Sequence, residues 1–455
     1  MRVRVSPSRK VLKQSLINSQ KQYPQRQHGA TLVFLTTVAL VLLWTVCSHG
    51  EIQSVFPGAV GFGIHTQAGT EGEVIRVTNL NADGPGSLRA ALDAEGPRLI
   101  VFEVAGVIDL DREQLVISEP HVTVAGQTAP SPGISIIRGG ILIRTHDVLI
   151  QHIRVRVGDA GLPKQYGWGP DGISTSGADA YNIVIDHCSI TWALDENASA
   201  SGPSTQGPEA TSRRVTFSNN IIAEALQDSA HPKGPHSCGS LNHDFVNEIA
   251  YIGNLFAHND RRNPYFKAHT TGVIANNVIY NPGLSAIKVG YVPDEWIGVD
   301  YEPENCRLSV VGNVLRYGVN TRPGLPLICH LWWVDCGGSA FIEDNRAYDQ
   351  GGAPVGIIDH AITVLHEKPL WPEGFEALPS DKVVDSIIRN VGARPWDRDA
   401  IDMRIVQQLQ DGGGRIIDSQ DEVGGYPDHE PVERTINVPD EGRREWLAGL
   451  TKQRD

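Results

Sequence analysis

Short apolar runs rich in Val and Ile recur along the chain, separated by Gly, Asn, Asp and Pro. Such runs are typical of β-strands, because β-branched residues fit an extended backbone and the separating residues favour turns. No long amphipathic pattern of helical period lies between them, which disfavours a fold of alternating strands and helices. The runs lie at residues 74–80, 99–104, 121–125, 134–137, 148–157, 182–191, 215–223, 249–257, 272–280 and 308–315.

Four of these runs share a motif in which an apolar strand is followed by Asn and then by a second apolar pair. The motif reads VTFSNNIIAEA, IAYIGNLFAHN, GVIANNVIYNP and LSVVGNVLRYG, and its Asn residues are Asn220, Asn254, Asn277 and Asn313. Their gaps of 34, 23 and 36 residues suit a coil of about 20–30 residues with inserted loops. Asn tolerates the left-handed backbone of a tight turn, and stacked Asn side chains can bond to one another. The pattern predicts an all-β solenoid. An antiparallel sandwich is the weaker interpretation, because hairpin dipeptides such as Asn-Gly are missing between the runs.

The two ends of the chain differ from this repeating middle. Residues 1–50 combine a basic start with a charge-free apolar run at 30–47, which is typical of an export signal and also long enough for a membrane anchor. We expect the solenoid to span 51–345 and a C-terminal extension, 346–455, to pack on it, with helical spacing at 399–409. We therefore expect a monomer that is secreted, periplasmic or at the cell surface, with membrane contact only through the N-terminal segment.

Charge and cysteine content narrow the partners and the redox chemistry. The 455-residue chain has a net charge of −14, and residues 1–50 hold seven cations and no acid, so the rest carries 32 cations against 53 acids. Nucleic acid is not an expected ligand, since phosphate binding needs a basic face. Cys188 lies in a strand pattern and is expected to pack as a small hydrophobe. Four further cysteines allow up to two disulfides: Cys238, Cys306, Cys329 and Cys336.

Six motifs in order carry a family resemblance. They are FPGAVGFG (56–63), VTNLNADGPGSLRAAL (77–92), VAGQTAPSPG (124–133), DGIS (171–174), VIDHCSITWALDE (184–196) and HNDRRNPYF (258–266). Together they resemble the pectate lyases of polysaccharide lyase family one, from about Phe56 to Asn345, and the tail motif IIDSQDEVGGYP is similar to the end of bacterial members. The resemblance implies a right-handed parallel β-helix, a groove along one sheet, and calcium-assisted β-elimination on pectate.

The chemistry of pectate cleavage sets what such a site must contain. Elimination removes the C5 proton of a galacturonate, which is weakly acidic because it lies beside a carboxylate. The site therefore needs cations on that carboxylate, a base near C5 and groups that stabilise the dianionic intermediate. Calcium suits the first task because it takes several oxygen ligands at flexible geometry.

The resemblance assigns the calcium ligands to Asp171, Asp195 and Glu196. The family often has a further Asp at the position of Gly169, which Asp159 could replace, although Asp159 is more typical of a turn residue. The alternative interpretation is that these acids are ordinary loop residues.

The resemblance also assigns the base and the cations that bind substrate. Arg262, in RRNP, matches the family's base, and Lys233, in HPKGPHSCG, matches a lysine that binds the substrate carboxylate. Lys267 stands where the family has arginine, which keeps the charge but loses the bidentate fork. Arg261 completes a cationic cluster that, with calcium, must offset an acidic body that repels a polyanion.

Several other polar residues invite interpretation. His231, His236 and His258 could be taken as metal ligands with Asp244, but their spacing fits no zinc motif, so we expect hydrogen bonds to sugar hydroxyls instead. Asp186 and His187 are expected to have structural roles. Arg154 and Arg156 share one strand face, and either line the groove or coat an exposed sheet. The insert at 292–337, with Trp296, Trp332 and Trp333, is expected to wall the groove, and the alternative is that it only caps the edge of the coil.

Three alternatives stay open. A polygalacturonase would need clustered aspartates as acid and base, and no Asp-Asp pair is present. A pectin lyase would act without calcium, which the three acids argue against. A non-catalytic carbohydrate-binding solenoid is favoured by Gly169 and Lys267, since fold alone does not establish activity.

Overall fold

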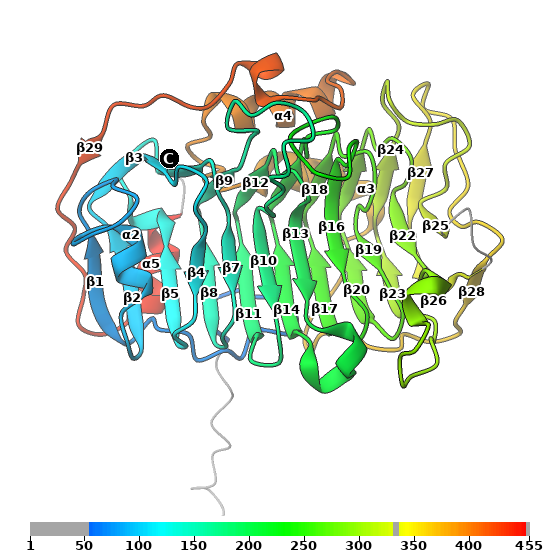
Figure 1. The fold of residues 1–455 in the computed structure, drawn as a ribbon, viewed down its shortest axis with the longest axis horizontal. Helices are drawn as coiled ribbons and strands as arrows, with labels where there is room; N and C mark the ends of the chain where they lie inside the picture. The colour runs from blue at the N-terminus through cyan, green and yellow to red at the C-terminus, as the bar shows by residue number, and fades with distance from the viewer. Residues whose placement is uncertain (1–53, 331–335, 452–455) are drawn as a thin grey trace, which may run out of the picture. The chain divides into compact units, whose positions relative to one another are not determined.

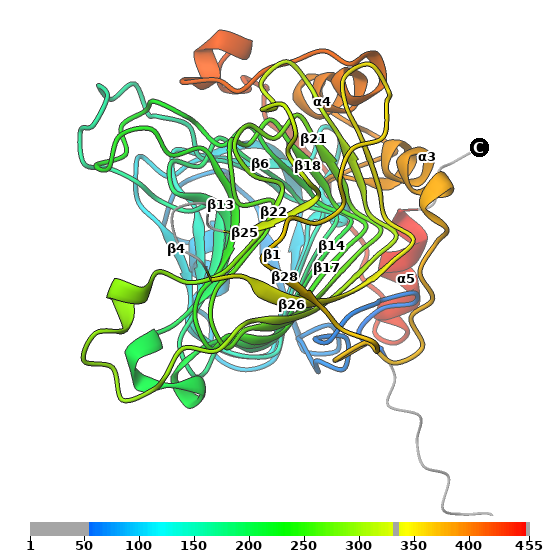
Figure 2. The ribbon, with the colours of Figure 1, turned by 90° about the vertical axis from the view of Figure 1, so that its right-hand side faces the viewer.

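The computed structural model describes residues 54–330 and 336–451, which form stacked coils of β-strands (Figure 1). Seen end-on, three sheets of parallel strands enclose the core (Figure 2). In the repeating part, each coil passes from the first sheet to the third and then to the second. The predicted all-β parallel β-helix is confirmed.

The strands of each sheet follow one another in chain order. The first sheet contains β1 (Glu73–Val77), β2 (Arg98–Phe102), β5 (Val122–Ala125), β8 (Val148–Gln151), β11 (Tyr181–Asp186), β14 (Arg213–Ser218), β17 (Asn247–Ile252), β20 (Thr271–Ala275), β23 (Arg307–Val311), β26 (Gly338–Glu343) and β28 (Ile362–Val364). The second contains β4 (Leu115–Ile117), β7 (Ile141–Ile143), β10 (Ile173–Ser176), β13 (Glu196–Ser201), β16 (Cys238–Asn242), β19 (Tyr265–Phe266), β22 (Ile287–Val289) and β25 (Ile328–His330). The third contains β3 (Val104–Asp109), β6 (Ile134–Ile137), β9 (Arg154–Arg156), β12 (Ser189–Thr191), β15 (Ile221–Ala223), β18 (Leu255–Ala257), β21 (Val278–Tyr280), β24 (Val314–Arg316) and β27 (Arg346–Tyr348), with β29 (Val432–Glu433) antiparallel to β3.

The Asn motif marks the bend between the first and third sheets, so each predicted run of this kind is two strands rather than one. The run 215–223, for example, is β14 followed by β15. The left-handed backbone falls on the residue before the ladder Asn, as at Asn219 (φ 54°) and Asn276 (φ 55°). The ladder Asn instead stays in place through its side-chain bonds to the neighbouring coil.

These bonds join five Asn residues into a ladder. Asn220 Nδ2 donates to Asn254 Oδ1 (3.0 Å), and the bonds from Asn254 to Asn277, Asn277 to Asn313 and Asn313 to Asn345 are each 2.9 Å. The sequence motif had located four of these residues, and Asn345 is the fifth. Satisfied amides of this kind stabilise a buried turn, because a buried polar group without a partner is costly.

Two C-terminal helices, α3 (Ser380–Asn390) and α4 (Ala400–Asp411), cover the third sheet. Their buried Val383, Ile387, Ile405 and Leu409 pack against a cluster that includes Leu255 and Val278. A third helix, α5 (Arg443–Leu450), packs through Leu447 on the first sheet. The short α2 (Leu88–Leu92) buries its leucines near the start of the coil.

Arg154 and Arg156 are buried beneath these helices, so both predictions for them are wrong. They are 1% and 0% exposed, and Arg156 Nη2 lies 2.8 Å from Asp399 Oδ2 and 3.0 Å from Asp402 Oδ1. The charge pattern of a single strand cannot reveal this, because the partners come from α4, some 240 residues later in the chain.

The described cysteines are thiols rather than disulfides. Cys188 is buried, as expected, in the core. Among the described residues, no helix is both long and apolar enough to cross a membrane. The predicted signal or anchor at 1–50 lies outside the described residues, as do Trp332 and Trp333.

Candidate active site

A groove of about 330 Å³ lies over the second sheet, where several coils bring charged side chains together. Its walls come from β13, β16, β19 and β22 and from the segments that enter these strands. The lining residues are Asp195, Glu196, Lys233, Leu241, His243, Arg261, Arg262, Tyr265, Lys267, Lys288, Val292 and Glu295. Parallel pairing in register explains the clustering, since residues at equivalent places on successive coils become neighbours.

Of the three predicted carboxylates, Asp195 and Glu196 line this groove, and Asp171 lies directly against Glu196. Asp171 lies just before β10, and Asp195 and Glu196 lie at the start of β13. Glu196 N–H donates to Asp171 Oδ1 (3.0 Å), and Ser199 Oγ donates to Asp171 Oδ2 (2.6 Å). Burial and the charge of Asp195 raise the pKa of Asp171 to about 7. A carboxylate held this way is poorly compensated, and a bound cation would relieve its repulsion with Asp195.

Two stacked histidines hold Asp195. His236 Nε2 lies 2.7 Å from Asp195 Oδ1 and His231 Nε2 lies 3.7 Å from Oδ2, with the ring centroids 4.0 Å apart. The Lys233 N–H donates to His231 Nδ1 (3.2 Å), so the proton of a neutral His231 sits on Nε2 and faces Asp195. Burial would raise the pKa of Asp195, but its contacts with His231 and His236 bring it well below its usual range.

Arg262 lies at the centre of the groove. Its guanidinium forms an ion pair with Glu196, and its Cζ lies 5.8 Å from the centroid of the Tyr265 ring. The backbone of Arg262 is left-handed (φ 63°), a strained conformation of the kind that clusters at functional sites. Burial lowers the pKa of Arg262, while Asp195 and Tyr265 act in the opposite direction.

Two of the three cations predicted to bind substrate are already paired with acidic side chains. Lys267 is buried and pairs with Asp244 (2.8 Å) and with Glu295, whereas Arg261 pairs with Asp260 (3.0 Å). Lys233 is exposed and lines the groove. The carboxylate of Asp244 therefore forms an ion pair with Lys267 and does not form a cluster with His231 or His236.

Lys288, on β22, was missed by the sequence analysis. It lines the groove, and its Nζ lies 4.9 Å from the centroid of the Tyr265 ring. Burial and the charge of Arg262 lower the pKa of Lys288 to about 8. The short strand IKV is apolar apart from this lysine, and that is the one signal in the sequence that could have drawn attention to it.

Comparisons with known proteins agree with this geometry. No family model matches the chain. The probable pectate lyase C of Emericella nidulans is 30% identical over 415 residues, which cover 89% of this chain and 87% of that protein. The probable pectate lyase C of Aspergillus flavus is 31% identical over 404 residues, 86% of each chain. The chain belongs to the pectate lyase family. It is thus a polysaccharide lyase.

Solved structures show the same fold. The major allergen from cedar pollen aligns with a TM-score of 0.54 at 18% identity, covering 73% of this chain and 92% of its own. A Bacillus subtilis pectate lyase aligns with a TM-score of 0.50 at 13% identity, covering 75% and 98%. The predicted membership of the pectate lyases is confirmed.

Within this pectate lyase, the carboxylate cluster fits a calcium ion. Asp171, Asp195 and Glu196 offer hard oxygen donors from neighbouring coils, which calcium prefers. Burial, together with the charge of Asp195, raises the pKa of Asp171, and a cation bound between these carboxylates would stabilise their ionised forms. The prediction that tryptophans wall the groove is wrong for Trp296. This residue is not among the lining residues and packs instead against Phe245 and His269.

Proposed function

We propose that this chain cleaves pectate by calcium-assisted β-elimination, with Arg262 as the base. The observation that carries the proposal is the position of Arg262, a half-buried guanidinium of lowered pKa in the same groove as Glu196 and Lys288. Asp171, Asp195 and Glu196 would hold the calcium. When bound, the ion neutralises the carboxylate of the substrate and so makes the neighbouring C5 proton more acidic.

The residues of the chain supply the other requirements of the reaction. Arg262 must release Glu196 and lose a proton before it can take the C5 proton, and burial favours the neutral form. The C4–C5 double bond forms as the C4–O bond breaks, and the leaving oxygen takes up a proton from solvent water. Lys233 and Lys288 line the groove, and in this proposal they would bind carboxylates along the polymer. We assign Lys267 a structural part, because two acids already neutralise it.

The absorbance of the unsaturated product tests the proposal. The full chain should release it from polygalacturonate with calcium and not with chelator. Arg262→Ala should abolish the signal, whereas the control Arg213→Ala, which removes a guanidinium on β14 of the first sheet that does not line the groove, should retain it. Equal activity of the two variants would refute the assignment of the base.

A carbohydrate-binding protein without catalysis is the second candidate. The ion pair of Arg262 with Glu196 and the neutralised Lys267 favour it. Polygalacturonate binding by a folded wild type that releases no unsaturated product would establish it.

We further propose that residues 1–50 direct the chain out of the cytoplasm. Measuring the size of the chain in the medium and in membrane fractions would test this.

A further inference from the structure

A second cavity, of about 230 Å³, lies far along the coil surface from the groove. It is enclosed where α5 and the segment around Trp396 lie over the ends of β8 and β11 of the first sheet. Figure 2 shows α5 on the opposite side of the coil from β13 of the groove. We call this cavity the α5 pocket; the residues that matter in it are Gln127, His152, Asp186, His187, Trp396 and Arg444.

Two histidines on successive coils line the α5 pocket. His152 Nδ1 bonds to Ala393 O (2.7 Å), and His187 Nδ1 bonds to Asp186 Oδ2 (2.8 Å). A neutral His152 therefore has the lone pair of Nε2 left over. Burial and the neighbouring His187 lower the pKa of His152 to about 3, which keeps its ring neutral. The ring centroids are 5.1 Å apart.

Asp186 orients this pair and is not itself available to a ligand. Its Oδ2 accepts from Gln151 (3.0 Å) and His187, and its Oδ1 accepts from Ser218 (2.8 Å) and Asn219 (3.0 Å). All its usual acceptor positions are occupied, so the carboxylate offers no further acceptor to a ligand in the pocket.

The opposite wall of the α5 pocket carries a cation, Arg444, that is not paired with an acidic side chain among the described residues. Arg444 has no ion pair among the described residues, and its Nε is buried without a hydrogen-bond partner there. Gln127 is 5% exposed, and its Oε1 also lacks a partner within the described residues, although its Nε2 donates to Gln151. Buried polar groups are normally satisfied, so these atoms indicate a polar occupant.

We propose that the α5 pocket binds one uronate ring, as a carbohydrate site separate from the cleavage groove. Nε2 of His152 and Oε1 of Gln127 would accept hydrogen bonds from hydroxyl groups, and Arg444 would pair with the carboxylate. Trp396, which contacts His152 edge-on at 5.0 Å, offers an apolar surface to the ring. The inference rests on the proposed function only for the choice of galacturonate as the uronate.

Calorimetric titration of the full chain with digalacturonate, in chelator and with Arg262→Ala as the starting protein, tests this site apart from cleavage. Arg444→Gln should weaken binding by about tenfold, which corresponds to one charge-assisted contact. His187→Gln should weaken it severalfold. Ala448→Phe should abolish digalacturonate binding. Ala448 lines the pocket, and a larger side chain would fill the pocket without removing a polar group.

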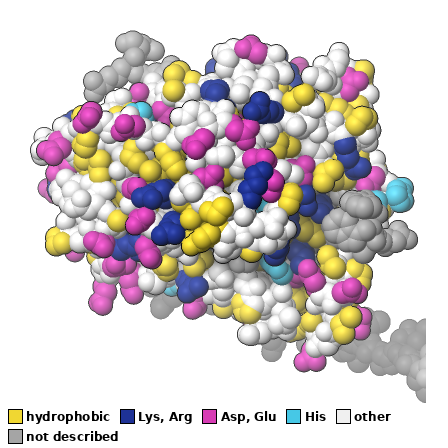
Figure 3. Space-filling model, turned by 45° about the horizontal axis from the view of Figure 1, so that its top comes forward, with side chains coloured by type: hydrophobic (Ala, Val, Ile, Leu, Met, Phe, Trp, Pro, Cys, Tyr) yellow, Lys and Arg dark blue, Asp and Glu magenta, His cyan; other side chains and the backbone are white. Residues whose placement is uncertain are grey.

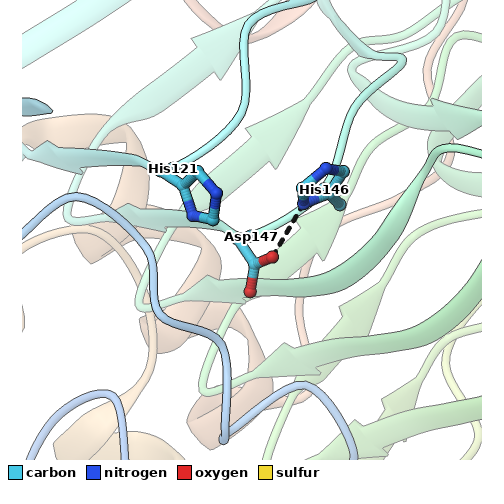
Figure 4. Close-up of side chains that lie close together, drawn as sticks. All are labelled: His121, His146 and Asp147. Carbon is cyan, nitrogen blue, oxygen red and sulfur yellow. Dashed lines mark hydrogen bonds and ion pairs between the residues drawn. The ribbon is translucent and has the colours of Figure 1, made fainter. Parts of the chain in front are cut away.

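The matched control is His146→Gln. His146 bonds through Nδ1 to Asp147 Oδ2 (2.7 Å), next to His121, so it forms the same kind of His–Asp pair at another turn of the coil (Figure 4). This variant should bind like the starting protein. Unchanged binding in both Arg444→Gln and Ala448→Phe, equal affinity for neutral galactobiose, or tight binding of Zn²⁺ with none of digalacturonate would each overturn the proposal. A failed cleavage assay would leave this result unaffected.

Discussion

His231 occupies the space that a side chain at Gly169 would need. A Cβ on Gly169 would stand 2.5 Å from His231 Cδ2. The missing acid at this position and the presence of His231 are therefore one feature, because only one of the two side chains fits. The imidazole contacts Asp195, so a hydrogen-bond donor has replaced a carboxylate beside the proposed calcium site.

This relationship predicts coupling between the two positions. Gly169→Asp alone should destabilise the fold by about 1–3 kcal/mol through overpacking and should not improve calcium affinity. Gly169→Asp combined with His231→Ala should recover stability and bind calcium more tightly than His231→Ala alone. Thermal unfolding and calcium titration of the four proteins in the cycle check this. Additive effects on both quantities would show that the positions are independent.

Lys288 should make pectate binding depend on pH. Its pKa of about 8 means that it is a cation below pH 8 and loses its charge above it. KM for pectate should therefore rise as pH passes through about 8. Lys288→Arg should flatten this rise, and Lys288→Met should raise KM about tenfold already at neutral pH, as expected for one lost charge-assisted contact. Identical profiles for wild type and Lys288→Arg would contradict the prediction.

The Asn ladder should contribute unequally along its length. Asn254 both accepts from Asn220 and donates to Asn277 and to Phe217 O, so Asn254→Ala should cost about 2–3 kcal/mol by leaving buried partners unsatisfied. Asn345→Ala makes the same substitution at the half-buried end and should cost about 1 kcal/mol. Denaturant unfolding measures both. A larger loss at Asn345 would mean that the ladder does not act through its buried bonds.

His152 should make the fold sensitive to acid. Its pKa is about 3 in the folded protein, and an unfolded histidine titrates near 6.5. Between these values the unfolded chain binds a proton that the folded chain refuses, so the free energy of unfolding falls as pH decreases from about 6.5 toward 3. His152→Asn, which tolerates the left-handed backbone there (φ 58°), should make this slope shallower by up to about 1.4 kcal/mol per pH unit. Parallel slopes would exclude His152 as the cause.

The repeat predicted the coil because it repeats a physical requirement: every bend must satisfy a buried amide. Asn220, Asn254, Asn277 and Asn313 could be found from spacing alone. The resemblance identified Asp171, Asp195, Glu196 and Arg262, and the structure brings all four together. Residues paired across long separations could not be predicted. Arg156 meets Asp399, and Lys267 meets Asp244 and Glu295, only once the coil and its loops are folded. The place of Lys288 in the groove could not be predicted for the same reason, since only the register of β19 and β22 places it beside Tyr265.

Because each coil of the Asn ladder contributes one Asn, the coil is the unit by which the solenoid can be lengthened or shortened. One coil separates Asn254 from Asn277 in only 23 residues, and each coil advances the sheets by about 4.8 Å. A duplicated coil that keeps its Asn would enter the stack without disturbing the bonds on either side. The length of the groove, and with it the number of sugar residues that it can hold, is therefore a quantity that gene duplication or protein engineering can change in whole steps.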